Sequence, residues 1–172
     1  PQKKLKLVPS ARYPKNLDLG FENTIFLPYE IFNQEIIIKE FENLIINSPI
    51  NTFNFLKIKS HPMAIDSKTQ NLIKLKLENI IKRNKNRFDK KKVKNTAIFI
   101  GPTTGAIVAL EKKIKVIHIC FDPIFDSYSS ALWPNLKVVP LSKNTFIYNV
   151  KKINTFIKFS KYKNCYERYY DI

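Results

Sequence analysis

Short apolar runs alternate with longer amphipathic segments through the middle of the chain. Five runs rich in β-branched and aromatic residues predict strands: TIFL at 24–27, FNFLKIKS at 53–60, TAIFIG at 96–101, KVIHICF at 115–121 and LKVVPL at 136–141. Apolar residues at helical spacing predict helices over 31–48, 66–86, 102–113 and about 144–160. Strands that are apolar along their whole length are typical of a parallel sheet covered on both faces. We therefore expect an α/β fold with a doubly wound, mostly parallel sheet of about five strands and helices on both faces.

The first two predicted helices have recognisable ends and apolar faces. Asp66 or Ser67 is expected to be the N-cap of the second helix. The apolar face of the first helix is expected to contain Ile31, Phe32, Ile36, Ile38, Phe41, Leu44 and Ile45, and that of the second Leu72, Leu75, Ile80 and Ile81. These side chains are predicted to pack on the sheet.

The length of 172 residues and the hydrophobic content of 44% predict one compact domain. We place this domain at 21–160, after a basic lead at 1–20 and before a basic, aromatic tail at 161–172. Two readings of the tail stay open, a packed end of the last helix and a segment resting on an anionic membrane leaflet. The first residue is Pro1, and we expect the chain to be part of a longer protein.

The net charge of +16 has two interpretations: the protein binds an anionic partner, or it simply has a solvated, lysine-rich surface. Only four residues are arginine (Arg12, Arg83, Arg87 and Arg168). Because arginine supplies the bidentate contacts by which proteins read nucleic acids, no specific nucleic-acid partner is expected. Two cysteines without a CxxC spacing indicate neither a zinc site nor a disulfide framework, and they favour a reducing, cytoplasmic setting.

In open α/β sheets, ligands bind at the carboxyl ends of the strands, so the residues that follow each strand are the candidates for a site. His61 and Pro62 follow the second strand, and Gly101, Pro102, Thr103 and Thr104 follow the third. A glycine turn and two hydroxyls at a helix start offer N–H and O–H donors to a phosphate. The alternative is that a threonine only caps the helix. His61 is either a donor to the same phosphate or a structural residue.

Two further sets of polar residues carry weaker signals. His118 lies within an apolar strand and is expected to be a core or cross-strand residue. The loop after this strand contains Asp122, Ser129 and Ser130, which are candidates for binding a nucleotide or sugar; an ordinary polar loop is the alternative. Two dispersed histidines make a poor metal site, and no metal is predicted.

The pair His61-Pro62 and the pair Thr103-Thr104 within GPTTGAIVALE make the chain resemble the donor-binding half of bacterial GT-B glycosyltransferases that use CMP-activated sugars. This group includes sialyltransferases, polysialyltransferases and capsule Kdo transferases. The resemblance implies that His61 binds the CMP phosphate and assists its departure, while the paired hydroxyls hold the same phosphate. Thr-Thr replaces the Ser-Ser or Ser-Thr of many members, and the base that activates the acceptor lies in another domain of these enzymes.

The resemblance implies an enzyme that transfers a sialic-acid-like sugar from a CMP-activated donor to an acceptor glycan in surface polysaccharide or lipooligosaccharide synthesis. No obligatory cofactor is expected, and the setting is the cytoplasm, with peripheral contact to the inner membrane. Two alternatives stay open: a transferase using CDP-polyols or nucleoside-diphosphate sugars, and a noncatalytic module that binds anions through its lysine-rich surface.

Overall fold

A computed structural model describes residues 20–48, 53, 56–64, 67–88, 95–103, 105–121 and 136–150. Six strands form one sheet: β1 (Thr24–Phe26), β2 (Lys57–Lys59), β3 (Thr96–Ile100), β4 (Lys115–Ile119), β5 (Leu136–Ser142) and β6 (Thr145–Val150). The helices are α1 (Gln34–Asn47), α2 (Lys68–Arg83) and α3 (Gly105–Glu111), with short 3-10 turns η1 (Pro62–Ala64) and η2 (Lys85–Arg87). The protein therefore has the predicted α/β class.

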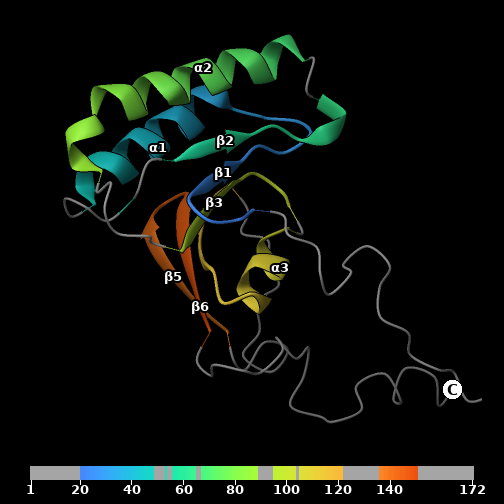
Figure 1. The fold of residues 1–172 in the computed structure, drawn as a ribbon, viewed down its shortest axis with the longest axis vertical. Coiled ribbons are helices and arrows are strands. Elements are labelled where there is room, and N and C mark those ends of the chain that lie inside the picture. Colours follow the sequence, from blue (N-terminus) through green and yellow to red (C-terminus); the bar gives the residue numbers. More distant parts are fainter. Residues whose placement is uncertain are drawn as a thin grey trace, which may run out of the picture.

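The sheet is mixed, with strand order β2-β1-β3-β4-β6-β5. β2, β1, β3 and β4 run parallel, whereas β6 is antiparallel to both β4 and β5. The expectation of about five mostly parallel strands is thus correct for the first four strands and for the presence of β5 at 136–142, whereas β6 and its antiparallel pairing were not predicted. Figure 1 shows the β5–β6 hairpin extending the sheet beyond β4.

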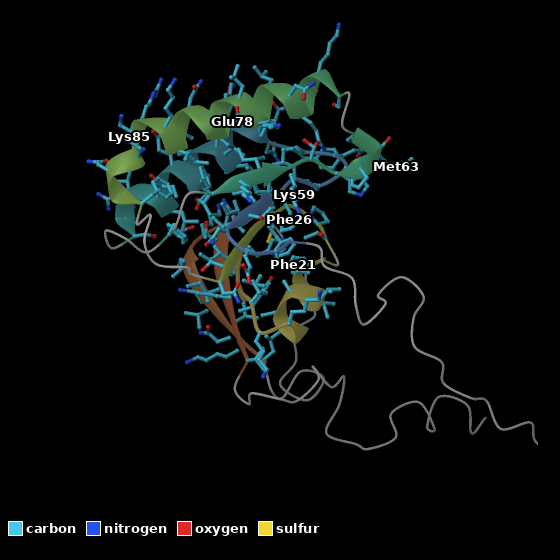
Figure 2. The ribbon with its side chains drawn as sticks, viewed as in Figure 1. Phe21, Phe26, Lys59, Met63, Glu78 and Lys85 are labelled. Carbon is cyan, nitrogen blue, oxygen red and sulfur yellow. The ribbon has the colours of Figure 1, made fainter. Side chains whose placement is uncertain are left out.

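Helices cover both faces of the parallel part, as the apolar strands predict. Alternate residues of β3 point to opposite sides: Ile98 and Ile100 pack with α1 and α2, whereas Ala97 and Phe99 pack with α3. Figure 1 shows α1 and α2 side by side on one face and α3 on the other. On the α3 face, the ring of Phe26 stacks on that of Phe99 with centroids 4.9 Å apart. The ring of Phe21 lies next to that of Phe26 (Figure 2).

The start of α2 agrees with the sequence, whereas its apolar face agrees at Ile80 and Ile81 and differs at Leu72 and Leu75. Ser67 is the N-cap, and its Oγ accepts a hydrogen bond from the N–H of Gln70 at 3.4 Å. The residues that pack inward are Gln70, Ile73, Leu77, Ile80 and Ile81. Leu72 and Leu75, which were expected in the core, are 48% and 54% exposed. The prediction was wrong because the closely spaced leucines and isoleucines of this segment fit two helical registers, and only packing on the sheet selects one.

The first helix begins later than predicted. Asn33 adopts a left-handed conformation (φ 51°), and its carbonyl accepts the N–H groups of Ile36 and Ile37. Phe32 precedes the helix and is exposed, and Ile36 faces outward, so neither is a core residue as predicted. The buried face consists of Ile37, Phe41, Leu44 and Ile45. At the other end, the Arg87 guanidinium donates to the carbonyls of Ile45, Ile46 and Ser48, which satisfies the end of α1.

The predicted last helix is wrong in its first part. Residues 145–150 form β6, which pairs with both β4 and β5, so that Ile147 lies opposite Ile117 and Val139. The remainder of that segment, 151–160, and the tail at 161–172 lie outside the described residues. A strand is favoured over a helix here because the backbone N–H and C=O groups of β6 pair with β4 on one side and with β5 on the other.

Lys113 offers a test of the local backbone at the end of α3. Its φ of 63° is left-handed, the Ile114 N–H bonds to the Ala109 carbonyl, and the Lys113 N–H bonds to that of Leu110, which together make a Schellman motif. Glycine is the preferred residue at this position. We expect Lys113→Gly to raise the free energy of unfolding by about 1 kcal/mol in urea denaturation. Lys112→Gly, next to it and without positive φ, serves as the control and should not stabilise.

None of the helices that the structure describes combines the length and the apolar character required to cross a lipid bilayer.

Candidate functional site

The carboxyl ends of β2, β1 and β3 lie next to one another, because these strands are parallel neighbours. The chain moves from β1 to β2 on one side and then returns past β1 to β3 on the other. This reversal of direction is the place where open α/β sheets leave a crevice for a ligand. We call the residues after these three strands the rim: Pro28 and Tyr29 after β1, His61 after β2, and 101–103 after β3.

His61 is half-buried, and a backbone group fixes its ring. The Met63 N–H donates to His61 Nδ1 at 3.2 Å, and the Ala64 N–H donates to the His61 carbonyl at 2.9 Å. Because Nδ1 accepts a hydrogen bond, the proton of the neutral ring resides on Nε2. No described residue bonds to Nε2, so this N–H remains available to a ligand.

The end of β1 joins His61 to the rest of the rim. The rings of Tyr29 and His61 meet edge to face, with centroids 5.7 Å apart. From α2, the buried Gln70 amide donates to the carbonyl of Pro28 and, at 3.1 Å, to that of Tyr29. Gln70 Oε1 is buried and has no partner among the described residues. The start of α2 is thereby fastened directly to the rim.

Gly101 connects the other side of the rim to β1. Its φ is 64°, a conformation that favours glycine, and a Cβ at this position would lie 3.1 Å from Pro28 Cγ. Its N–H donates to the Ile119 carbonyl at 2.8 Å, and its own carbonyl accepts from His118 Nε2 at 2.7 Å. The turn after β3 is therefore held from β1 and from β4.

Thr103 both caps α3 and keeps a donor. Its Oγ1 accepts the Gly105 N–H at 3.1 Å and thereby satisfies the first N–H of α3, which is close to the capping role considered from the sequence. The hydroxyl proton is not used in that bond and can still be donated to a ligand. Pro62 and Pro102 are exposed at the rim. The two possibilities for Thr103, structural cap and ligand donor, are compatible.

His118 is a buried histidine of the core, as predicted, and it supports the rim from below. With Nε2–H donated to Gly101, Nδ1 accepts the Tyr148 hydroxyl at 2.9 Å and lies 3.4 Å from Cys120 Sγ. Burial lowers the pKa of His118 to about 4, although the Gly101 carbonyl opposes part of that shift. The ring is therefore neutral at pH 7, which the bond from Tyr148 to Nδ1 requires.

The structure thus places His61 and Pro62 at the end of β2 and Gly101, Pro102 and Thr103 at the end of β3, on either side of β1. Tyr29 contacts the first group and Pro28 lies next to Gly101. Thr104, Asp122, Ser129 and Ser130 lie outside the described residues, so their predicted roles stay predictions. A cavity of about 290 Å³ lies elsewhere, between α1 and the β5–β6 hairpin, and includes Glu40, Asn43 and Leu141 but no rim residue. Within the described ranges, no three His, Cys, Asp or Glu side chains are grouped to hold a metal.

Two residues that support the rim, Gln70 and Tyr148, were not identified from the sequence. Gln70 could have been found, because it is a polar residue on the same helical face as Ile73 and Leu77, where only a satisfied polar group is tolerated. Tyr148 could not, because its segment was assigned to a helix and its pairing with β4 depends on the tertiary structure.

Comparisons of the chain with protein-family models, curated proteins and solved structures found no match.

Proposed function

We propose that this chain is the donor-binding domain of a glycosyltransferase that uses a CMP-activated, sialic-acid-like sugar, built as the Rossmann-like half of a GT-B fold. The observation that carries the proposal is the placement of His61 and Gly101–Thr103 on either side of the β1 carboxyl end. These residues are distant in sequence, and His61 and Thr103 each keep one donor at the strand ends where such sheets bind phosphates. The Gly101 N–H, which the sequence offered as a further donor, is bonded to the Ile119 carbonyl instead.

The proposal assigns two donors of the rim to the same phosphate. His61 Nε2–H and the Thr103 hydroxyl each carry a proton that no described residue accepts. In the proposed reaction, the bond between the anomeric carbon and the phosphate oxygen breaks, and the bond electrons leave with CMP. The acceptor hydroxyl oxygen forms the new bond to that carbon, and its proton passes to a base outside the described residues. Donors placed where negative charge grows lower the barrier.

The tautomer of His61 refines its role. The Met63 N–H occupies Nδ1, so the ring acts through Nε2–H as a hydrogen-bond donor to the phosphate. The second pKa of a phosphate monoester is about 6. CMP can therefore depart at neutral pH with hydrogen bonds alone, and the proposal needs neither full proton transfer from His61 nor a metal bridging two phosphates.

The transferred sugar and the acceptor follow from the same proposal. A sialic-acid-like sugar would pass to a glycan of a surface polysaccharide or lipooligosaccharide, with the enzyme in the cytoplasm against the inner membrane. The alternative donors, CDP-polyols and nucleoside-diphosphate sugars, carry a second phosphate and are distinguished by the experiment below.

The test is a calorimetric titration of CMP, CDP, UMP and UDP into the purified protein. We expect preferential binding of CMP and a loss of about tenfold in affinity in His61→Ala, because one hydrogen bond to a charged phosphate is removed. Thr103→Val should also weaken binding, since it removes the hydroxyl donor and keeps the side-chain shape.

Asn79→Ala is the matched control, because Asn79 is an exposed polar residue of α2 away from the rim. Thermal unfolding of each variant separates loss of binding from loss of fold. Preference for CDP or UDP would replace the CMP-sugar assignment by a diphosphate donor. Binding of none of the four nucleotides, or equal binding in His61→Ala, would overturn the proposal.

A further inference from the structure

The outer face of α2 combines positive charge with exposed apolar side chains. Leu72 and Leu75 lie about half exposed on the side opposite Ile73, Leu77, Ile80 and Ile81. Helical spacing places Lys68, Asn79 and Lys82 in the same row as the two leucines, and Lys76 and Arg83 beside it. We call these seven residues the α2 outer face. Figure 2 shows the side chains of α2 projecting away from the rest of the molecule along the whole helix.

The charged residues of the α2 outer face are all basic, and its surroundings on the same segment are mostly basic too. α2 and η2 contain Lys68, Lys74, Lys76, Lys82, Arg83, Lys85 and Arg87 against a single acid, Glu78. Arg87 is engaged with the end of α1, so it does not contribute to the outer face. The other basic side chains form no ion pair within the described part of the chain. They are free to meet an anionic partner.

We propose that the α2 outer face is a docking surface for an anionic lipid membrane. A helix that lies in a membrane interface presents apolar side chains to the acyl region and basic side chains to the headgroups, which is the arrangement of Leu72 and Leu75 among Lys68, Lys82 and Arg83. Each basic residue near an anionic leaflet adds to the binding free energy. The net charge of +16 adds long-range attraction to the same surface.

A lipid surface explains features that a nucleic acid does not. Two half-exposed leucines in the centre of the basic face match no phosphate or base, and they gain free energy only by leaving water for an apolar phase. Only Arg83 on this face offers a bidentate fork, and α2 has no aromatic side chain on which a base could stack. The inference deepens the membrane contact of the proposed function and rests on it in that respect. None of the outer-face residues belongs to the rim, so loss of vesicle binding and loss of nucleotide binding are distinguishable.

The experiment is sedimentation of the protein with vesicles of phosphatidylcholine, alone or mixed with phosphatidylglycerol. We expect binding to the anionic vesicles only, and a decrease of the partition coefficient by at least about tenfold in the Lys76→Glu, Lys82→Glu double variant. Leu72→Ser with Leu75→Ser should also weaken binding, and its effect should persist at high salt, where electrostatic attraction is screened.

Lys137→Glu with Lys143→Glu is the matched control, because these exposed residues of the β5–β6 hairpin carry the same charge change away from α2. This variant should bind the vesicles nearly as the unchanged protein does. Equal weakening in the control would assign binding to diffuse charge and overturn the proposal. Equal binding to vesicles of phosphatidylcholine alone would also overturn it. A third contrary result is unchanged vesicle binding of the leucine variant together with complete displacement of the protein from vesicles by double-stranded DNA.

Discussion

Lowering the pH from 7 to 4 is expected to reduce the free energy of unfolding by on the order of 3 kcal/mol through His118 alone. The pKa of this residue is about 4 in the folded protein and about 6.5 in the unfolded chain, and burial is the main cause. Between these two values the unfolded chain binds a proton that the folded protein does not. Stability contributed by His118 is therefore fully present above pH 6.5 and is lost as the pH falls toward 4.

Urea denaturation as a function of pH measures this effect. His118→Gln removes the titrating group and should flatten the part of the profile between pH 6.5 and 4. An NMR titration of the unchanged protein gives a second reading, because the His118 ring should titrate near pH 4. Titration near pH 6.5, or an identical pH profile in His118→Gln, would show that the buried, neutral ring is the wrong description.

Replacing Gly101 by alanine is expected to lower the free energy of unfolding by about 2 to 3 kcal/mol. Left-handed backbone costs an alanine about 1 to 2 kcal/mol. The new Cβ would also lie 3.1 Å from Pro28 Cγ, which is closer than ordinary van der Waals contact. Both effects act at the rim, so nucleotide affinity should fall along with stability. Urea denaturation and calorimetry on the same variant measure the two losses.

Gly101→Asn is the informative comparison, because asparagine carries the same Cβ but tolerates the left-handed region better than alanine. Asparagine should therefore destabilise less than alanine, and the difference isolates the backbone contribution. Should alanine cost less than about 0.5 kcal/mol, the turn after β3 does not depend on glycine and the rim is less tightly fixed than proposed.

Helix α2 illustrates how far the sequence predicts the fold. Its start was predictable, because Ser67 is a strong N-cap whose side chain satisfies an N–H that the helix leaves free. Its orientation was not, because Leu72 and Leu75 continue the apolar pattern as well as Ile73 and Leu77 do. The two leucines that were expected in the core lie instead on the surface proposed to contact the membrane.

The β5–β6 hairpin shows a different limit. The turn at Lys143 and Asn144 has no glycine, so the usual two-residue hairpin signal is absent from the sequence. The pairing of β5 with β6 also contains a register irregularity at Pro140 and Ser142, which the sequence does not indicate. In isolation the apolar residues of 145–157 also fit a helix. The edge of β4 decides the matter, because it offers β6 a partner for its backbone hydrogen bonds.

The sequence by itself determined the α/β class, the four parallel strands and the position of His61, Gly101 and Thr103 after them, because local propensity, caps and apolar runs act over a few residues. Only the tertiary structure decided the direction of the last strands, the face that α2 buries and the contacts that join the rim through Pro28, Tyr29 and Gln70. These outcomes depend on which surfaces fit together and on how each buried polar group finds a partner. Such information resides in pairs of residues distant along the chain.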